Sequence, residues 1–245
     1  MVLENRQLSM ASYKRVLCKL SGESLSSSSG FGYDPSSISS IAKTLSAAVD
    51  RGVELAVVIG AGNLFRGQKA DLPYKRTSLD QVGMLATLMN GKILKEALFS
   101  CGKNASIFNA FTCGSFANIY TEDAVEKAFT QGHIAIFTGG TSHPFLTTDT
   151  AAALRAAEIR ADALIKLSTV SCIYDKDPHL YPDAKQQQKL TYREVIEKKL
   201  AVMDLEAIVL CEKENIPIIV TNFSDEMQFL KAVSNETVGT LVTSE

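Results

Sequence analysis

The segment Phe137-Thr-Gly-Gly-Thr-Ser-His-Pro-Phe-Leu-Thr-Thr-Asp149 decides how the rest of the chain is interpreted. The apolar residues 134–137 that enter it predict a buried strand, and the alanine-rich residues 148–160 that leave it predict a helix. Glycine lets backbone approach a ligand closely, and a helix N-terminus offers unpaired N–H groups with partial positive charge. The segment therefore fits a phosphorylated small molecule. Taken alone, it fits equally well a structural strand-to-helix turn that Thr148 caps.

Strands and helices alternate on both sides of this segment. Residues 15–20 and 53–59 predict strands around a helix that begins at Asp34-Pro35 and ends at Gly52. The same patterns predict further strands at residues 105–108, 163–167, 216–220 and 240–242, and further helices at residues 79–99, 122–130, 205–214 and 225–233, with a short helix after the capping box 191–194. This alternation predicts an α/β fold whose mainly parallel sheet is covered on both faces. We expect one domain over residues 13–245, after a disordered leader over residues 1–12.

Three of the predicted strands end in glycine-containing turns. These turns are residues 19–23 (Lys-Leu-Ser-Gly-Glu), 60–63 (Gly-Ala-Gly-Asn) and 139–141 (Gly-Gly-Thr). In an open parallel sheet, ligands bind beyond the carboxyl ends of the strands. The three turns are therefore expected to share one crevice, and together they favour a phosphate or nucleotide site.

The absence of several known catalytic motifs restricts the reactions that this chain could catalyse. The sequence has neither the GxxxxGK[ST] loop nor GxGxxG, because the segment that starts at Gly60 lacks the third glycine. It also has no GxSxG elbow, and its three histidines have no evident nucleophile beside them. What remains is phosphoryl transfer by positioning and charge neutralisation, which needs cations but no covalent nucleophile.

Composition excludes several other classes of protein. The net charge is −2 over 245 residues, and no lysine or arginine run stands out, which argues against nucleic acid or a membrane surface as partner. The five cysteines are far apart and form no CxxC, so a structural zinc site is not expected. Scattered thiols and the absence of an apolar leader or membrane-length run favour the cytoplasm.

Few basic side chains are placed to neutralise phosphate. Lys19 and Lys166 each lie in an otherwise apolar strand, where a lysine is costly to bury unless it meets an anion. Arg66, four residues after Gly62, could clamp a phosphate, or be an ordinary surface arginine. Asp149 could orient the two lysines, or only compensate the helix dipole.

Taken together, the motifs resemble those of the bacterial uridylate (UMP) kinases of the amino-acid kinase superfamily. The similarity covers nearly all of residues 13–243. It rests on Lys19-Leu-Ser-Gly-Glu23, the Gly30–Gly32 loop, Val57-Val-Ile-Gly-Ala-Gly-Asn-Leu-Phe-Arg-Gly67, Met84-Leu-Ala-Thr-Leu-Met-Asn-Gly91, Pro144-Phe-Leu-Thr-Thr-Asp149 and Val202-Met-Asp-Leu205.

The resemblance implies a three-layer αβα sandwich, a homohexamer, and Mg²⁺- and ATP-dependent conversion of UMP to UDP in pyrimidine nucleotide biosynthesis. Because the sequence shows no cluster of carboxylates, we expect phosphate oxygens and water to be the main ligands of Mg²⁺. By position, the catalytic residues would be Lys19, Arg66, Asp149 and Lys166. The ATP site would comprise Lys19, Leu20, Ser21, Gly22, Gly62, Arg66, Ser168, Tyr174 and Asp177. The UMP site would comprise Ala61, Asp80, Thr141, Ser142, His143, Pro144, Phe145, Leu146, Thr147 and Thr148.

The sequence departs from the family at some of these positions. Ala61 replaces a usual glycine, His143 a common asparagine, and Ser168 one of the usual residues on the ATP side. GTP-activated relatives carry basic residues near the positions of Phe99, Ser106 and His133, where this chain largely lacks them.

Alternative functions remain open at this level. A sibling kinase acting on a carboxylate or carbamate is one, and a non-catalytic nucleotide-binding storage or regulatory protein is another. A plain dinucleotide-binding module ranks third.

Overall fold

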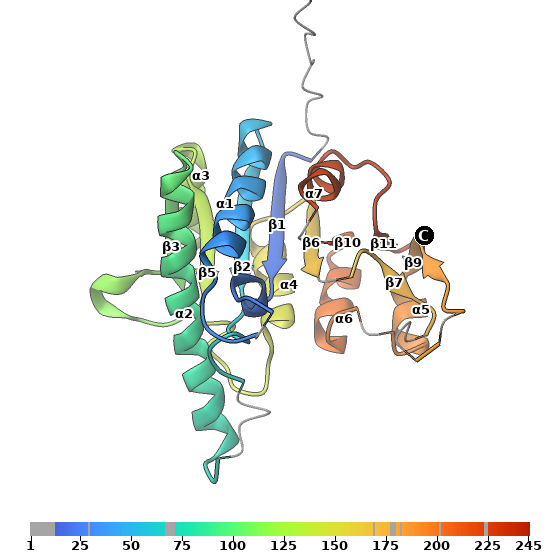
Figure 1. Ribbon diagram of the computed structural model, residues 1–245, viewed down its shortest axis with the longest axis horizontal. Coiled ribbons are helices and arrows are strands. Elements are labelled where there is room, and N and C mark those ends of the chain that lie inside the picture. Colours follow the sequence, from blue (N-terminus) through green and yellow to red (C-terminus); the bar gives the residue numbers. More distant parts are fainter. Residues whose placement is uncertain are drawn as a thin grey trace, which may run out of the picture.

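The fold is built on a mainly parallel sheet, which Figure 1 shows between two layers of helices. The computed structural model describes residues 13–28, 30–66, 72–168, 170–176, 180–181, 183–200, 202–222 and 225–245. The leader expected over residues 1–12 lies outside them. Within these residues, nine strands run in the order β4-β3-β5-β2-β1-β6-β10-β11-β9. Their bounds are β1 (Arg15–Leu20), β2 (Glu54–Ile59), β3 (Ala105–Asn109), β4 (Asn118–Ile119), β5 (Ile134–Thr138), β6 (Ala163–Ser168), β9 (Lys189–Thr191), β10 (Ile218–Asn222) and β11 (Thr240–Thr243).

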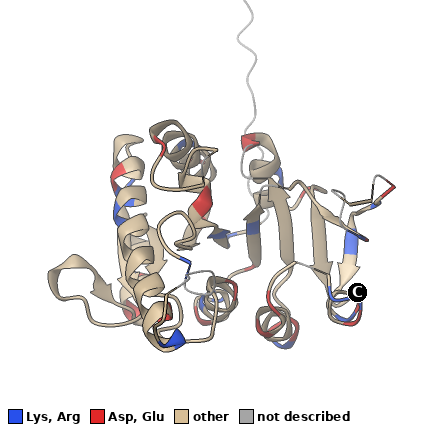
Figure 2. Ribbon diagram, turned by 60° about the horizontal axis from the view of Figure 1, so that its bottom comes forward, with Lys and Arg blue, Asp and Glu red and all other residues tan. Residues whose placement is uncertain are grey.

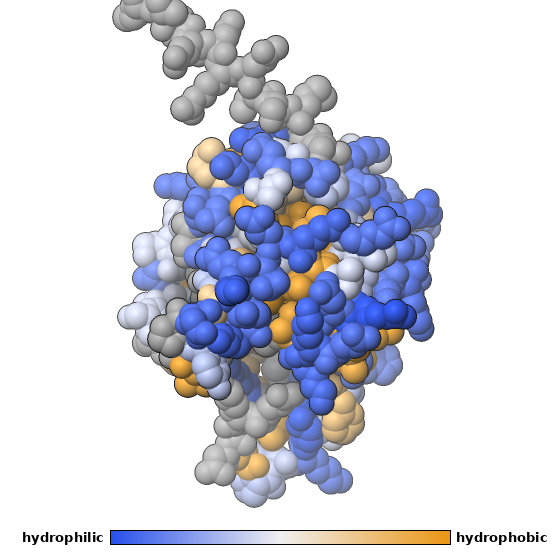
Figure 3. Space-filling model, turned by 90° about the vertical axis from the view of Figure 1, so that its right-hand side faces the viewer, coloured by the Kyte–Doolittle hydropathy of each residue, from blue (hydrophilic) through white to orange (hydrophobic). Residues whose placement is uncertain are grey.

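The sheet is parallel from β4 across to β10. Strand β11 runs antiparallel to β10, and β9 runs parallel to β11, so the two strands at this edge reverse the direction. A separate antiparallel pair, β7 (Ile173–Tyr174) and β8 (Gln186–Gln187), lies outside the main sheet. Figure 3 shows the β9 side of the molecule. This face is mostly hydrophilic, with a strip of hydrophobic side chains between the hydrophilic ones.

Seven helices of the described residues cover the two faces of the sheet. One core cluster packs the sheet against α1 (Pro35–Asp50), α2 (Arg76–Ser100) and α7 (Glu226–Val233). The other packs it against α3 (Glu122–Thr130), α4 (Thr148–Glu158), α5 (Tyr192–Glu197) and α6 (Leu205–Lys213). Along β1, Val16, Cys18 and Leu20 belong to the first cluster and Leu17 to the second, because alternate side chains of a strand point to opposite faces. The predicted three-layer α/β architecture is confirmed.

The charged residues lie mainly on the helices and loops. Figure 2 shows the strands mostly uncharged, with charge at only a few positions, as expected for strands that are buried on both faces. Lysines 19 and 166 are therefore exceptions to the composition of the strands that carry them.

Helix starts follow the predicted signals closely. Asp34 caps α1 by accepting the N–H of Ser37, with Pro35 at the first helical position, and Thr191 and Glu194 form the expected capping box. The expected cap at Thr148 is wrong by one residue. Thr147 is the N-cap of α4, because its side chain accepts the N–H of Asp149 while its backbone is still extended.

Some elements were not predicted. Residues 22–25 and 114–116 form short 3-10 helices, and β4, β7, β8 and β9 are only two or three residues long. Strand β10 begins at Ile218 rather than Ile216. The carbonyl of Pro217 still accepts the N–H of Leu164, but proline has no N–H to donate to a ladder.

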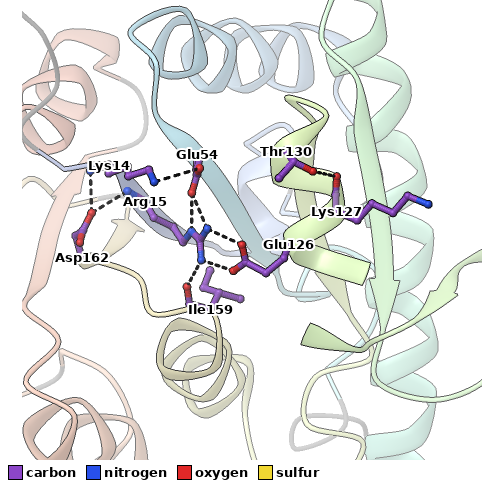
Figure 4. A network of polar contacts seen from close by, with 8 residues as sticks. All are labelled: Lys14, Arg15, Glu54, Glu126, Lys127, Thr130, Ile159 and Asp162. Carbon is purple, nitrogen blue, oxygen red and sulfur yellow. Dashed lines mark hydrogen bonds and ion pairs between the residues drawn. The ribbon is translucent and has the colours of Figure 1, made fainter. Parts of the chain in front are cut away.

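An arginine fastens the amino end of β1 to its neighbours (Figure 4). Nε of Arg15 donates to Glu54 on β2 at 2.7 Å, Nη2 to Glu126 on α3 at 3.0 Å, and Nη1 to the carbonyl of Ile159 after α4 at 2.6 Å. Asp162, before β6, accepts the backbone N–H of both Lys14 and Arg15 at 2.8 Å. These contacts set the position of β1, whose opposite end carries Lys19.

Candidate active site

The three glycine turns predicted to share a crevice do so. They follow β1, β2 and β5, which are neighbours in the sheet, and they line one cavity of about 370 Å³. Of the residues singled out from the sequence, the cavity is lined by Lys19, Ser21, Gly22, Ala61, Gly62, Arg66, Asp80, Thr141, Leu146, Thr147 and Thr148. Helix α2 and the start of α4 close its sides.

Gly22 is where the first two turns approach most closely. A Cβ atom there would lie 2.6 Å from Oδ1 of Asn63 and 2.7 Å from both the carbonyl oxygen of Gly60 and the nitrogen of Gly62. Such distances are too short for any side chain, so only glycine allows these two turns to pack together. The turn after β5 needs glycine for a different reason, because Gly139 and Gly140 have φ values of +80° and +58°.

Lys19, which lines the cavity, forms a cluster of charges with Asp149 and Lys166. Nζ of Lys19 lies 2.7 Å from Oδ1 of Asp149, and Nζ of Lys166 lies 3.1 Å from Oδ2. Lys166 also donates to the carbonyl of Val202. Asp149 therefore sets the separation of two cations that come from different strands, which is the role considered for it from the sequence.

Burial and charge act in opposite directions on this cluster. Burial raises the pKa of Asp149, but the two lysines more than offset this effect and hold the pKa below its usual value. Burial also lowers the pKa of Lys166, which its ion pair with Asp149 offsets only in part. Lys166 is thus easier to deprotonate than an ordinary lysine, and its charge depends on the carboxylate beside it.

Backbone N–H groups of the turns complete the positive surface. In the described part of the chain, no residue accepts a hydrogen bond from the N–H of Ala61, Gly62, Gly140 or Thr141. All four residues line or border the cavity. Unpaired N–H groups that converge on one cavity are a favourable environment for phosphate oxygens.

Arg66 lies at the rim and forms an ion pair with Glu23. It packs across the turn that follows β2, since a Cβ on Gly62 would lie 3.2 Å from its Nε. Both side chains are partly exposed, so solvent weakens this ion pair.

Asp80 ties the loop after β5 to helix α2. Its Oδ1 accepts Nε of Arg76 at 2.6 Å, and its Oδ2 accepts the backbone N–H of Phe145 at 2.9 Å. Phe145 and Ser142 have φ values of +73° and +62°, which are uncommon for residues other than glycine. The loop is therefore held in a strained conformation that presents Thr141, Leu146, Thr147 and Thr148 to the cavity.

Four residues expected at the UMP site do not line this cavity. They are Ser142, His143, Pro144 and Phe145. The ring of His143 is exposed, with Nδ1 2.8 Å from the carbonyl oxygen of Thr141, and Phe145 is largely exposed over Arg76. Leu20, expected at the ATP site, is buried in the core, and only its carbonyl contacts the turn, by accepting the N–H of Gly60.

A second cavity of about 490 Å³ lies beside the carboxyl end of β6. Ser168 and Tyr174, both expected at the ATP site, contribute to its wall, together with the catalytic candidate Lys166 and apolar side chains such as Ile173 and Val202. Asp177, the other residue expected there, lies outside the described residues. Lys19 lines the first cavity and Lys166 the second, and Asp149 forms an ion pair with each, so the two cavities adjoin at this cluster.

Sequence reasoning assigned no role to several polar residues around the site. Asp204 accepts the hydroxyls of Thr147 and Thr150, the latter at 2.8 Å, and also caps α6. Thr87 and Asn90 on α2 bond to the turns themselves. Only the Asp204 cap had a local signal, an acidic residue directly before a helix; the other contacts depend on the tertiary fold.

Among the described residues, no group of three or more His, Cys, Asp or Glu lies close enough together to hold a metal ion. None of the helices formed by these residues has the length and apolar character needed to cross a membrane.

The chain is similar to known proteins over nearly its whole length. The model of the amino acid kinase family matches residues 14–222. A uridylate kinase from Fervidobacterium nodosum is 43% identical over 230 residues, which are 94% of this chain and 98% of the relative. One from Francisella tularensis subsp. holarctica is 43% identical over 232 residues, 94% of this chain and 93% of the relative.

Solved structures give the same result. A UMP kinase from Bacillus anthracis superimposes with a TM-score of 0.92 at 33% identity, covering 95% of this chain and 97% of the other. A UMP kinase from Ureaplasma parvum superimposes with a TM-score of 0.88 at 28% identity, covering 94% and 99%.

Proposed function

The chain belongs to the amino acid kinase family, and we propose that it phosphorylates UMP to UDP, with ATP as donor. The observation that carries the proposal is the junction of the two cavities, where Asp149 holds Lys19 and Lys166 together. Relatives that are 43% identical over 94% of the chain are uridylate kinases, which supports UMP as the acceptor.

The reaction is direct in-line transfer. A phosphate oxygen of UMP forms a bond to the γ-phosphorus of ATP while the bond from that phosphorus to the β,γ-bridging oxygen breaks, and ADP leaves. The attacking oxygen is already an anion, so no general base is needed. Lys19, Lys166, Arg66 and the backbone N–H groups of the turns would align the reactants and stabilise charge in the transition state.

The two nucleotides would lie on either side of Asp149. UMP would occupy the cavity beside α2, with its ribose at Asp80 and its phosphate near Ala61 and Thr141–Thr148. ATP would place its phosphates along Lys19–Gly22 and its nucleoside in the cavity that contains Ser168 and Tyr174. A ribose hydroxyl at Asp80 would share or replace the contact from Arg76, since both carboxylate oxygens already have donors.

Mg²⁺ would enter with ATP. Both oxygens of Asp149 face lysines, and the described residues contain no cluster of metal-binding side chains, so phosphate oxygens and water would be its ligands. When bound, the ion neutralises charge on the transferring phosphates.

A homohexamer of cytoplasmic subunits completes the proposal. Its oligomeric state follows from the family resemblance, and an exposed apolar stripe on α2, made of Val82, Leu85 and Met89, supports it. These residues are spaced by three and four and so lie on one face of the helix. Exposed stripes of this kind mark surfaces that pack against another protein, here a second copy of the chain. The five free cysteines fit a reducing compartment, and residues 13–245 form the single kinase domain.

The experiment that tests the proposal is an assay of UDP formation from UMP and ATP with Mg²⁺, with and without GTP. CMP, acetylglutamate and carbamate serve as alternative acceptors in parallel reactions. Preference for acetylglutamate or carbamate would identify a sibling kinase instead. Tight binding of ATP and UMP without UDP formation would identify a non-catalytic nucleotide-binding protein, and binding of NAD would revive the dinucleotide-binding alternative.

A further inference from the structure

Two buried asparagines form a reciprocal amide pair behind the turn that follows β2. Nδ2 of Asn90 on α2 donates to Oδ1 of Asn63 at 2.7 Å, and Nδ2 of Asn63 lies 3.3 Å from Oδ1 of Asn90. Both residues are fully shielded from solvent. An unpaired amide would be costly at such a position, so the pair is held in one arrangement.

The remaining amide hydrogens of the pair bind two loops. Asn90 donates to the carbonyl of Gly60 at 2.7 Å, and Asn63 donates to the carbonyl of Gly32 at 2.9 Å. The N–H of Gly32 returns a bond to the backbone carbonyl of Asn63 at 2.8 Å. The four amide hydrogens therefore all have acceptors, and they join α2, the Gly60 turn and the Gly32 loop.

The bond from Asn90 fixes the plane of the Gly60–Ala61 peptide. In a trans peptide, the carbonyl and the next N–H point in opposite directions. Because the Gly60 carbonyl is held against Asn90, the N–H of Ala61 points away from α2's amide. This N–H is one of those without an acceptor among the described residues, and Ala61 lines the cavity.

Thr87, which lies one turn earlier on α2 than Asn90, forms a hydrogen bond with the turn that follows β5. Oγ1 of Thr87 accepts the N–H of Gly139 at 2.7 Å and donates to the carbonyl of Met84 at 2.7 Å. The N–H of Gly139 therefore has an acceptor, whereas the N–H groups of Gly140 and Thr141 have none among the described residues. One turn of α2 thus contacts two of the three glycine turns.

We propose that Asn90, paired with Asn63, and Thr87 are positioning residues of the phosphoryl-transfer site. They touch no reacting atom. They orient the peptides after β2 and β5 so that the N–H groups of Ala61, Gly62, Gly140 and Thr141 converge on the transferring phosphoryl group. The inference rests on the proposed function, because it takes that group as the ligand.

The first test is Asn90→Asp in the full-length chain. The substitution keeps shape and volume but places an oxygen against the carbonyl of Gly60. We expect kcat for UDP formation to fall about 100-fold, as for a small misplacement of reacting groups, with little change in KM for either nucleotide. Asn63→Asp should behave alike, and the double variant should lose little more than either single one, because residues that act as a unit are not additive.

The pH dependence separates positioning from a general loss of stability. Protonation of the new carboxyl restores one donor, and burial raises the pKa of such a group. The kcat of Asn90→Asp, relative to the unchanged protein, should therefore recover as the pH is lowered from 8 to 6. Thr87→Val should lower kcat as well, whereas Thr87→Ser, which keeps the hydroxyl, should retain it.

Tyr192→Phe is the matched control. Its hydroxyl is buried and donates to the carbonyl of Ile216 at 2.5 Å, in the core between α5 and β10. Its loss should lower the melting temperature without changing kcat. If Asn90→Asp and Thr87→Val, compared at a temperature where all variants are folded, also keep kcat, the inference is wrong.

Hydrogen exchange gives a readout that is independent of activity. In Asn90→Asp, amides of a peptide spanning residues 57–66 should exchange faster than in the unchanged protein, while Tyr192→Phe should leave them unaffected. Unaltered exchange there would contradict the inference. If the unchanged protein makes no UDP and the exchange in Asn90→Asp is nevertheless faster, the proposed function is overturned and the pair is left as an anchor of the turn only.

Discussion

Lys19 on β1 and Lys166 on β6 are register partners on adjacent parallel strands. Parallel strands that pair in this way carry their side chains on the same face, so two ammonium groups are brought together by the sheet itself. Such an arrangement is repulsive unless an anion lies between them, and Asp149 supplies one from the first turn of α4. A phosphoryl group in transfer would be a second anion at the same position.

Removal of one lysine should therefore abolish most of the activity. We expect Lys19→Ala to lower kcat for UDP formation by about 100- to 1,000-fold, a typical loss for one group that stabilises transition-state charge. Lys14→Ala is the control, since Lys14 lies next to β1 but is largely exposed at the opposite edge of the sheet. Wild-type rates for Lys19→Ala at saturating UMP and ATP would refute the assignment.

Asp149→Asn should change the pH profile of the residual activity. Burial already lowers the pKa of Lys166, and the Asp149 carboxylate raises it again. Without that carboxylate the pKa falls further, so activity should be lost at a lower pH on the alkaline side than in the unchanged protein. Steady-state rates between pH 6 and 10 would show the shift. Asp50→Asn, which removes a surface ion pair with Lys103, should not move the profile.

Asp80→Ala should weaken binding of UMP alone. The carboxylate is expected to hold the ribose and also anchors the N–H of Phe145. Hydrogen bonds to a charged group contribute about 1.5–3 kcal/mol, so KM for UMP should rise roughly 10- to 100-fold. KM for ATP should stay nearly constant. The control is Lys92→Ala, on the exposed side of the same helix, which should leave KM for both UMP and ATP unchanged. Equal increases for both nucleotides would place Asp80 elsewhere.

Two glycines of α2 should respond to alanine in opposite ways. A Cβ at Gly91 would lie 2.5 Å from Cγ2 of Thr138, so Gly91→Ala should push the helix from β5 and lower the free energy of unfolding by about 1–3 kcal/mol. A Cβ at Gly83 would have its nearest neighbouring atom 4.0 Å away. Gly83→Ala should therefore raise the free energy of unfolding by up to about 1 kcal/mol, because alanine has the higher helix propensity. Urea denaturation measures both, and a neutral Gly91→Ala would show that the contact relaxes.

A charge on the exposed stripe of α2 should dissociate the assembly. Leu85→Asp, alone or with Met89→Asp, would place a carboxylate in a surface that is expected to be covered by another subunit. Sedimentation equilibrium should then give a smaller mass than for the unchanged protein. Met227→Asp, at an equally exposed apolar residue on α7, is the control. An unaltered mass for the Leu85 variants would remove this helix from the interface.

Much of the fold could be predicted because it rests on local signals. The apolar runs of β1, β2, β5 and β6 and the helical periodicity of α1 are strong over whole elements. Residues 170–191 were harder, because strands of two or three residues have too few positions to show a period. The reversal at β11 has no local signal, since a strand reads the same in either direction.

The same distinction between local signals and tertiary contacts applies to the residues of the candidate site. Lys19, Lys166 and the glycine turns stand out because a charged or flexible residue interrupts an apolar run. The Asn63–Asn90 pair does not, because its members are 27 residues apart and meet only in the folded protein. Thr147 and Thr148 differ in capping only through backbone conformation, and the outward direction of His143 follows from the turn at Ser142, where φ is positive. Neither the capping residue nor the direction of His143 can be predicted from the types of residue alone.

The central position of β1 has a consequence for the order in which the protein is made. The hydrogen bond between the N–H of Lys14 and Asp162 closes a span of 148 residues. A nascent chain that ends at Thr138 already contains β1, β2, β3 and β5, but neither Asp149 nor Lys166. Until α4 leaves the ribosome, Lys19 lacks its counterion, and until β6 follows, one edge of β1 stays unpaired. Pairings of such long range form slowly, so catalytic competence is expected to be acquired late in folding, after the N-terminal half of the sheet.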